Sequence, residues 1–145
     1  MAINREAIYS ALFSLVSGLP GFVTKARRFK HWADVDPSMQ PALFMVQKTE
    51  TFEQNTKMPS KITMRCELYM YHNVGGDENA VAATVLNPLL DQITNILMPN
   101  PAVGEQTLGG LVERCRVEGV IETDEGLLGA QGLVIVPVTI YLAAA

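Results

Sequence analysis

The clearest pattern of apolar and polar positions lies at residues 61–72, which alternate with a period of two. Successive side chains of a β-strand point to opposite faces, so this alternation predicts a strand with one buried face. The positions on the apolar face are Ile62, Met64, Cys66, Leu68 and Met70. The opposite face carries Thr63, Arg65, Glu67, Tyr69 and Tyr71, which is typical either of a solvated sheet face or of an interface rich in tyrosine and arginine.

A second strand pair is predicted at the C-terminal end of the sequence. Residues 133–142 (LVIVPVTIYL) are nearly all β-branched or aromatic, and the turn-rich stretch 123–132 separates them from a first arm at 111–122. In that first arm Arg114, Arg116 and Glu118 fall on one strand face and need water or a partner there. Pro137 has no N–H to donate, so its strand is expected to be an edge strand or to be bulged at that point.

Two segments show the spacing of amphipathic helices. The first begins at Asn4, a suitable N-cap, and ends before Gly18 and Pro20, and we interpret it as a helix of the mature protein rather than a signal peptide. The second spans Glu78–Met98, with Pro88 either inside one kinked helix or at the start of a fresh helix capped by Asn87. The apolar positions that recur every four residues in it are Val81, Val85, Leu89, Ile93 and Leu97.

Together these elements predict one α+β domain over residues 1–145, with a mostly antiparallel mixed sheet and both helices packed on one face. A third early strand is expected at residues 40–47. The polar stretch 48–60 and the stretch 122–132 are predicted to be mobile loops, which either have a function or are simply exposed connections without one. The chain is 48% hydrophobic and 18% charged with a net charge of −4, a composition that indicates a globular protein and argues against one that coats nucleic acid.

One dense basic run, residues 24–32 (TKARRFKHW), contrasts with this acidic balance. It includes Arg27 and Arg28. Three interpretations remain open: an exposed edge strand whose cations discourage aggregation, a docking patch for an acidic protein, or a nucleic-acid contact.

The sequence shows no catalytic or metal-binding pattern that matches a known chemistry. GxSxG, HExxH, CxxC and the phosphate-binding glycine loop are all missing from it. Cys66 and Cys115 fall on apolar strand faces and are expected to be buried, reduced thiols rather than zinc ligands. Asp124 and Glu125 are adjacent acids on a predicted turn, where solvation is their usual role. No enzyme activity, cofactor or metal is therefore expected.

The order of several segments and their residue patterns resemble those of the tail terminator (tail completion) proteins of long-tailed bacteriophages. The resemblance covers most of the chain, and its most telling parts are KHWADVDPSMQPALF at 30–44 and the C-terminal hairpin with its IYL end. The matching segments are ALFSLVSGL at 11–19, RRFKHWADVDPSMQPALFMVQ at 27–47, YMYH at 69–72, DENAVAATVLNPLLDQITNIL at 77–97 and GLVERCRVEGVIETDEGLLGAQGLVIVPVTIYL at 110–142.

This resemblance implies a virion structural protein of the tail and neck region, assembled in the host cytoplasm. It would form a ring of about six copies on the last disc of the tail tube, stop tube polymerisation and present a surface to the head-completion or connector protein. Its partners would be further copies of itself, the tail tube protein and that head protein, with no membrane and no specific nucleic-acid binding, since DNA would only pass through the ring. The candidate contact residues are Arg65, Glu67, Tyr69, Tyr71, Arg114, Arg116, Glu118, Arg27, Arg28, Lys57, Asp124 and Glu125.

Other functions remain open at this point. Another neck or tail-tube subunit of the same virion would have a similar composition but would polymerise into open stacks. A small ligand-binding or catalytic α+β domain would need a pocket between helices and sheet, and a nucleic-acid binder would use residues 24–32.

Overall fold

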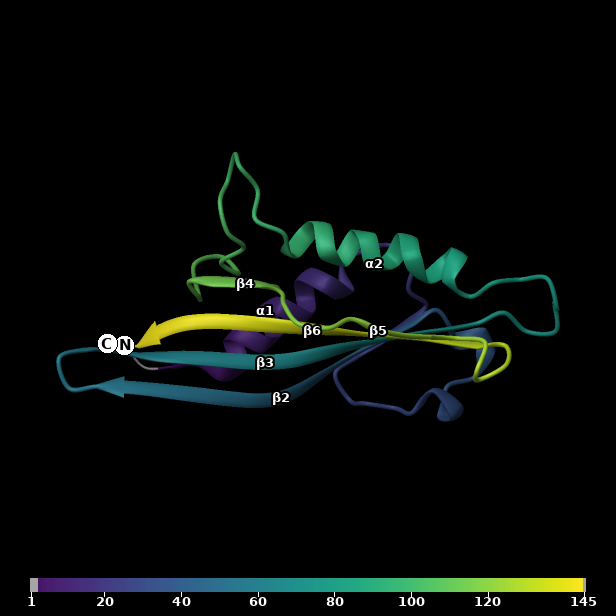
Figure 1. The fold of residues 1–145 in the computed structure, drawn as a ribbon, viewed down its shortest axis with the longest axis horizontal. Helices are drawn as coiled ribbons and strands as arrows, with labels where there is room; N and C mark the ends of the chain where they lie inside the picture. The colour runs from purple at the N-terminus through teal and green to yellow at the C-terminus, as the bar shows by residue number, and fades with distance from the viewer. Residues whose placement is uncertain (1–2, 145) are drawn as a thin grey trace.

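The computed structural model describes residues 3–144 and contains two α-helices, two short 3₁₀ turns and six strands (Figure 1). The two 3₁₀ turns, η1 and η2, lie in the connection between β1 and β2. The elements in chain order are α1 (Arg5–Ser17), β1 (Thr24–Ala26), η1 (Trp32–Asp34), η2 (Pro37–Met39), β2 (Ala42–Asn55), β3 (Met58–Asn73), α2 (Ala83–Leu97), β4 (Arg114–Val117), β5 (Glu122–Glu125) and β6 (Gln131–Ala144).

The strands form a single mixed sheet with the order β1-β2-β3-β6-β4, and β5 also pairs with β6. Only β1 runs parallel to its neighbour; the pairs β2–β3, β3–β6, β4–β6 and β5–β6 are all antiparallel. The predicted α+β class with a mostly antiparallel sheet is therefore confirmed.

Both helices cover one face of this sheet, which we call the helix-side face. The predicted apolar face of β3 is buried there, with each of its five side chains 2% exposed or less. The same core contains residues of both helices and of the facing strands, so the prediction of two helices on one face is also confirmed. The helical members of this core are Ile8, Tyr9, Leu12 and Val16 from α1 and Leu86, Leu89, Ile93 and Leu97 from α2.

The helix boundaries agree with the sequence for α1 and less well for α2. The Asn4 side chain accepts a hydrogen bond from the backbone N–H of Ala7 at 3.0 Å, which confirms the predicted N-cap. The second helix begins only at Ala83 and continues through Pro88, so a fresh helix starting at Asn87 is wrong. Val81 and Val85 are exposed because the buried stripe of α2 is built from Leu86, Leu89, Ile93 and Leu97 instead.

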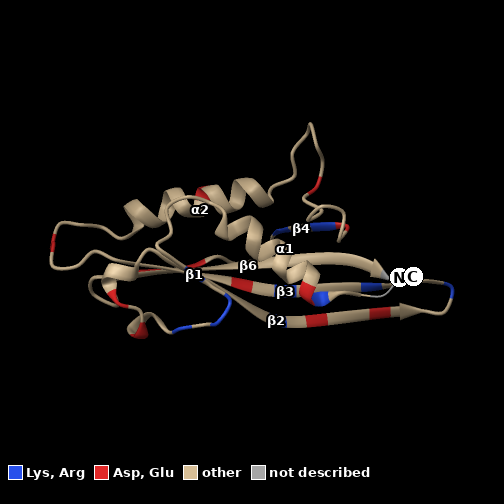
Figure 2. Ribbon diagram, turned by 180° about the vertical axis from the view of Figure 1, so that it is seen from behind, with Lys and Arg blue, Asp and Glu red and all other residues tan. Residues whose placement is uncertain are grey.

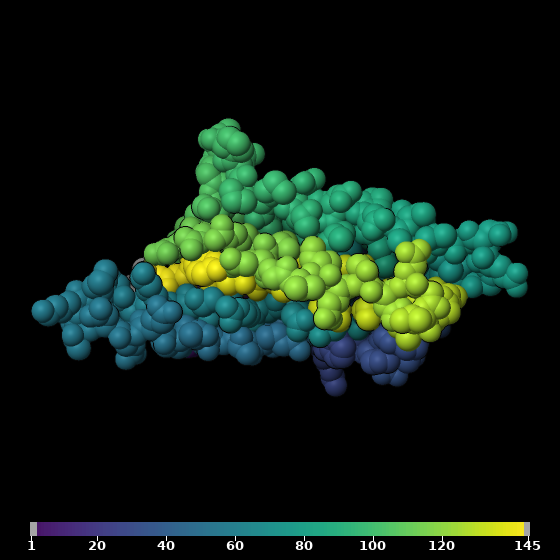
Figure 3. Space-filling view, in the orientation of Figure 1, coloured from purple at the N-terminus to yellow at the C-terminus, as the bar shows by residue number. Residues whose placement is uncertain are grey.

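The prediction of a loop at 48–60 is wrong, because β2 and β3 continue through this stretch and meet at a two-residue turn, Thr56-Lys57. We call residues 51–60 the arm. Residues 51–59 are all exposed, and Figure 3 shows the arm as a projection beyond the body of the molecule. Strand pairing here is carried by backbone hydrogen bonds without burial, so the apolar alternation that reveals a half-buried strand is absent.

The predicted first strand of the C-terminal hairpin, residues 111–122, is also divided. Residues 114–117 and 122–125 are separate strands, and the predicted loop at 122–132 shrinks to residues 126–130. The break lies opposite Pro137, where Glu118 donates its backbone N–H to the Pro137 carbonyl at 3.2 Å. Gly119 has φ 117°, and a side chain there would come within 3.2 Å of the proline ring. The prediction that the strand of Pro137 is an edge or is bulged there is wrong, because β6 lies inside the sheet and pairs with β3 without a register shift. The missing N–H is accommodated instead by the break between β4 and β5.

The opposite face of the sheet, the outer face, is covered at one end only, by residues 27–41, which we call the covering segment. Val35 packs there against Ala42, Phe44 and Tyr71. Tyr71 was expected on an exposed surface, yet it is 1% exposed and its hydroxyl donates to the Lys30 carbonyl at 2.8 Å. The three-residue strand β1 lies at the sheet edge, so the edge-strand interpretation of the basic run is confirmed for Thr24–Ala26 alone.

A reciprocal pair of amides fastens the covering segment to the sheet. Gln40 donates its side-chain N–H to the Gln131 side-chain oxygen at 3.1 Å, and Gln131 donates back at 2.8 Å. The same Gln40 amide also donates to the Val35 carbonyl. Both glutamines are buried, at 6% and 3% exposed. Buried amides contribute to stability only when they are paired in this way.

Candidate interaction surface

The strand register brings the two predicted charged faces together on the uncovered half of the outer face. Arg116 is paired with Thr139 of β6, and Thr139 is paired with Arg65 of β3. Directly opposed residues of a sheet share a face, so both arginines lie beside Thr139. Arg114 is aligned in the same way with Tyr141. The sequence predicts two separate charged strands, and the fold brings their charged sides together in one surface.

An arginine–tyrosine stack occupies the β4 side of this surface. The guanidinium carbon of Arg114 lies 4.3 Å from the centre of the Tyr141 ring, and that of Arg116 lies 5.6 Å from it. The Tyr141 hydroxyl donates to the Glu118 carboxylate, and this hydrogen bond raises the pKa of the tyrosine. Arg116 is 3.9 Å from the same carboxylate. The Nε atoms of both arginines are buried without a hydrogen-bond partner, so this stack leaves donor capacity unused.

The β3 side of the surface is also cationic. Lys48 pairs with Glu67 at 3.2 Å and lies 5.9 Å from the Tyr69 ring centre, while Arg65 is exposed and makes no hydrogen bond or ion pair among the described residues. We call this surface the open face. It comprises Lys48, Arg65, Glu67, Arg114, Arg116, Glu118 and Tyr141 around the buried Thr139, with four cations against two carboxylates in a chain whose net charge is −4.

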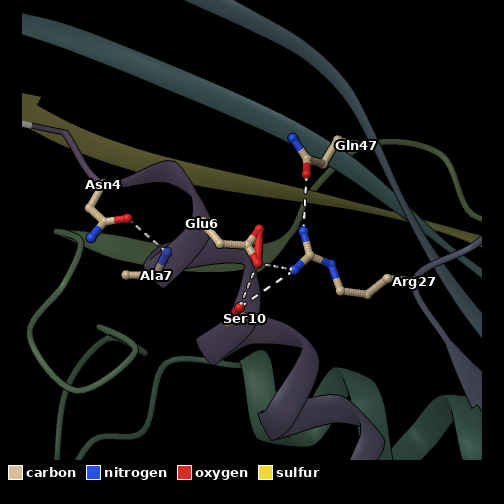
Figure 4. Close-up of polar contacts among 6 residues, drawn as sticks. All are labelled: Asn4, Glu6, Ala7, Ser10, Arg27 and Gln47. Carbon is tan, nitrogen blue, oxygen red and sulfur yellow. Dashed lines mark hydrogen bonds and ion pairs between the residues drawn. The ribbon is translucent and has the colours of Figure 1, made fainter.

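The remaining predicted contact residues lie elsewhere. Arg27 is engaged inside the molecule, where it pairs with Glu6 of α1 at 2.7 Å and donates to Gln47 of β2 at 3.1 Å (Figure 4). The guanidinium lowers the pKa of the Glu6 carboxyl. Arg28 is exposed on the covering segment, and Lys57 is at the tip of the arm. Arg27 therefore ties α1 to the sheet edge and offers little to a partner.

Two further predicted residues, Asp124 and Glu125, are in strand β5 at the far end of the sheet from the arm. They belong to a strand rather than to the turn that was expected. Asp124 is paired with Leu133 and has one carboxylate oxygen buried without a partner, while Glu125 is exposed. They are thus separated from the open face along β6.

The apolar side chains of the arm were not predicted from the sequence. Phe52 and Met58 are 45% and 60% exposed. Phe52 is paired with Ile62, so it continues the apolar helix-side face beyond the end of the helices. The only sequence signal was the β-prone run Thr49–Phe52, which the surrounding polar residues obscured.

The reactive side chains are scattered or buried. In the described part of the chain no group of three or more His, Cys, Asp or Glu residues is arranged to hold a metal ion. Cys66 and Cys115 are both fully buried, and burial raises the pKa of the Cys115 thiol to about 12. Residues 3–144 also contain no helix long and apolar enough to cross a membrane.

Comparison with known proteins adds information on the fold alone. No model of a protein family matches the sequence, and no curated protein matches it either. In contrast, 29 solved protein chains match the structure. One of them superposes with a TM-score of 0.50 at 12% sequence identity, and the match covers 99% of this chain and 98% of that one. The match shows that this fold recurs in a chain of nearly the same extent.

Proposed function

We propose that this chain is a structural subunit of a bacteriophage virion that forms a ring at the head-proximal end of the tail tube. In this role a ring of about six copies ends tail polymerisation and offers the surface on which the head joins the tail. The proposal rests on the resemblance of residues 11–142 to tail terminator proteins. The described residues also fit a non-enzymatic role, because their conspicuous features are surfaces rather than reactive groups.

The observation that carries the proposal is the amount of sheet that this single chain leaves uncovered. The arm is a two-stranded ribbon whose residues 51–59 are exposed. Isolated two-stranded hairpins are marginally stable in water, so burial against a partner surface would stabilise a projecting ribbon of this kind. The open face beside it presents tyrosine and arginine, the residue types enriched at protein interfaces.

We assign a different contact of the assembly to each of these two features. A ring needs a head-to-tail interface that joins two different surfaces of each copy, and the open face supplies one of them. The arm projects beyond the body and presents Phe52 and Met58, so we assign it to the contact with the tail tube.

Native mass spectrometry with negative-stain imaging of the purified protein at high concentration tests the proposal. Closed rings of about six copies are expected. Open stacks or tubes would instead identify a tube subunit. If the protein stays monomeric, a pull-down with the tail tube protein decides, since a tail tip can act as a template, and no binding there would contradict the proposal.

An assembly reaction with a variant tests the role of the open face. Arg116→Glu is expected to block the production of finished tails, because it reverses a charge beside Tyr141. Lys25→Glu, which makes the same charge change on the exposed side of β1, is the matched control. Finished tails at the normal yield with Arg116→Glu would show that the open face is not a ring contact.

A further inference from the structure

The positive charges of this chain are unevenly distributed. No lysine or arginine occurs between Arg65 and Arg114, and none follows Arg116. Acidic residues occur from Glu67 to Glu113 in the first of these stretches and from Glu118 to Glu125 in the second, and none occurs in β6. The cations are therefore concentrated on α1, on residues 25–30, on the arm and on the open face.

Five acidic residues gather at one end of the sheet, the end whose outer face the covering segment covers. The loop after β3 and the turn between β5 and β6 are in contact there, since Val74 donates its N–H to the Ala130 carbonyl at 3.0 Å and residues of both segments line one hollow. Figure 2 shows red on the loop after β3 and blue on β4 and at the tip of the arm. We call this region the acidic end, and it comprises Asp77, Glu78, Glu122, Asp124 and Glu125.

Strand β6 sets the distance between the acidic end and the open face. Arg116 is paired with Thr139, whereas Asp124 is paired with Leu133, six residues earlier on the same strand. At about 3.3 Å per residue the two surfaces are roughly 20 Å apart. The Debye length is about 10 Å at 0.1 M salt, so the acidic end does not neutralise the open face of its own chain.

We propose that the open face of one copy docks against the free edge of β5 in the next copy, where Glu122 lies on the outer side of the strand and Glu125 on its helix side, so that Arg65 and Arg114 meet these two carboxylates across the contact. The occupant is a second copy of this chain, because the chain itself carries the complementary charge that the open face lacks. Contact between unlike surfaces is heterologous and closes into a ring when the rotation between copies allows it. This inference rests on the ring proposed above and names the two surfaces that build it.

Charge reversal on each surface separately, followed by mixing, tests the contact. One variant is Arg65→Glu/Arg114→Glu and the other is Glu122→Lys/Glu125→Lys, and none of these four side chains forms an ion pair in the described residues. Each variant alone presents like charges on both surfaces, so its half-assembly concentration in native mass spectrometry should rise more than about tenfold. An equimolar mixture presents opposite charges at every contact, so rings that alternate the two variants should return.

The control is Lys25→Glu/Lys30→Glu, which changes the net charge as much as the open-face variant does but acts at two exposed positions outside both surfaces. It should assemble like the unmodified protein. Added salt should weaken the unmodified ring, because the contact is between exposed charges. Thermal melts of every variant establish that the monomer is folded, and Arg65→Glu alone serves if the loss of the Arg114–Tyr141 stack unfolds the double variant.

Several results would overturn this inference. They are unchanged assembly of either single-surface variant, failure of the mixture to assemble when both variants are folded, and an unmodified protein that stays monomeric at high concentration and low salt. The ring function is judged separately by binding to the tail tube protein. If the protein binds the tube and the charge reversals leave ring assembly unchanged, this contact is rejected and the proposed function stands.

Discussion

The two ends of the β2–β3 strand pair show how differently one pair of strands can be used. At one end Phe44 and Tyr71 lie between the helix layer on one side and the covering segment on the other, and both are 1% exposed. At the other end the same two strands run on as the arm, exposed on both faces. Backbone pairing is continuous, but burial is not. The comparison separates two contributions. Backbone hydrogen bonding forms a strand, and burial under other elements stabilises it in a single chain.

Thiol reactivity should show the largest difference between the covered sheet and the arm. Cys66 and Cys115 lie under the helices, and burial raises the pKa of both thiols. We expect neither to react with a thiol reagent at pH 8 until the protein unfolds, whereas a cysteine introduced by Met58→Cys should react on the order of 10³-fold faster or more. Reagent kinetics followed by mass spectrometry measure both. Rapid labelling of Cys66 in the folded protein would contradict the described core.

Two phenylalanines on β2 offer a matched test of stability. Phe44→Ala removes a ring from the covered end and should lower the free energy of unfolding by about 3–5 kcal/mol. Phe52→Ala makes the same change on the arm, where the ring is 45% exposed, and should cost under about 1 kcal/mol. Urea melts of the monomer give both values. Equal losses would mean that the arm is as well covered as the body.

The covering segment can be loosened without removing an aromatic ring. Gln131→Leu leaves the buried Gln40 amide without its reciprocal partner and should cost about 1–3 kcal/mol. Replacing both glutamines by leucine removes the unpaired group as well, so the double variant should lose less than the sum of the two single variants. Additive losses in urea melts would show that the two amides do not act as a pair.

The smallest expected effect is a pH dependence at the end of β3 near the covering segment. Burial lowers the pKa of His72 below its ordinary value of 6.5, so the unfolded chain binds a proton more readily than the folded one. The neutral imidazole is favoured in the fold, and its contribution is present above pH 6.5 and is lost as the pH falls below 6.5 through the lower pKa of the folded state. The melting temperature should decrease from pH 7.5 to pH 5.5, and His72→Asn should flatten that slope. A slope that His72→Asn leaves unchanged would assign it to other groups.

The buried helix-side face was predictable from the sequence, whereas the exposed arm and the cover on the outer face were not. Alternation identified the buried face of β3 because burial imposes a period of two, and the same argument placed Arg114 and Arg116 on a common face. On the arm nothing is buried, so Thr51–Asn55 had no apolar pattern and resembled a loop. Tyr71 was wrongly predicted to be exposed, because the covering segment, which is distant in sequence, buries it. Whether the outer side of a strand is covered depends on chain topology, which periodicity does not encode.

Amide hydrogen exchange of the free protein and of the protein bound to isolated tail tubes tests the central claim most directly. That claim is that the arm and the open face are contact surfaces. In the free protein the amides of residues 51–60 should exchange quickly and those of residues 62–71 should stay protected. The amides of β4 should exchange at an intermediate rate, because this short strand pairs with β6 and Cys115 donates its N–H to the Gln106 carbonyl at 2.8 Å. On the tubes, the arm and β4 should become protected and residues 62–71 should change little. Arm and β4 amides that exchange equally fast on the tubes and in solution would contradict the account.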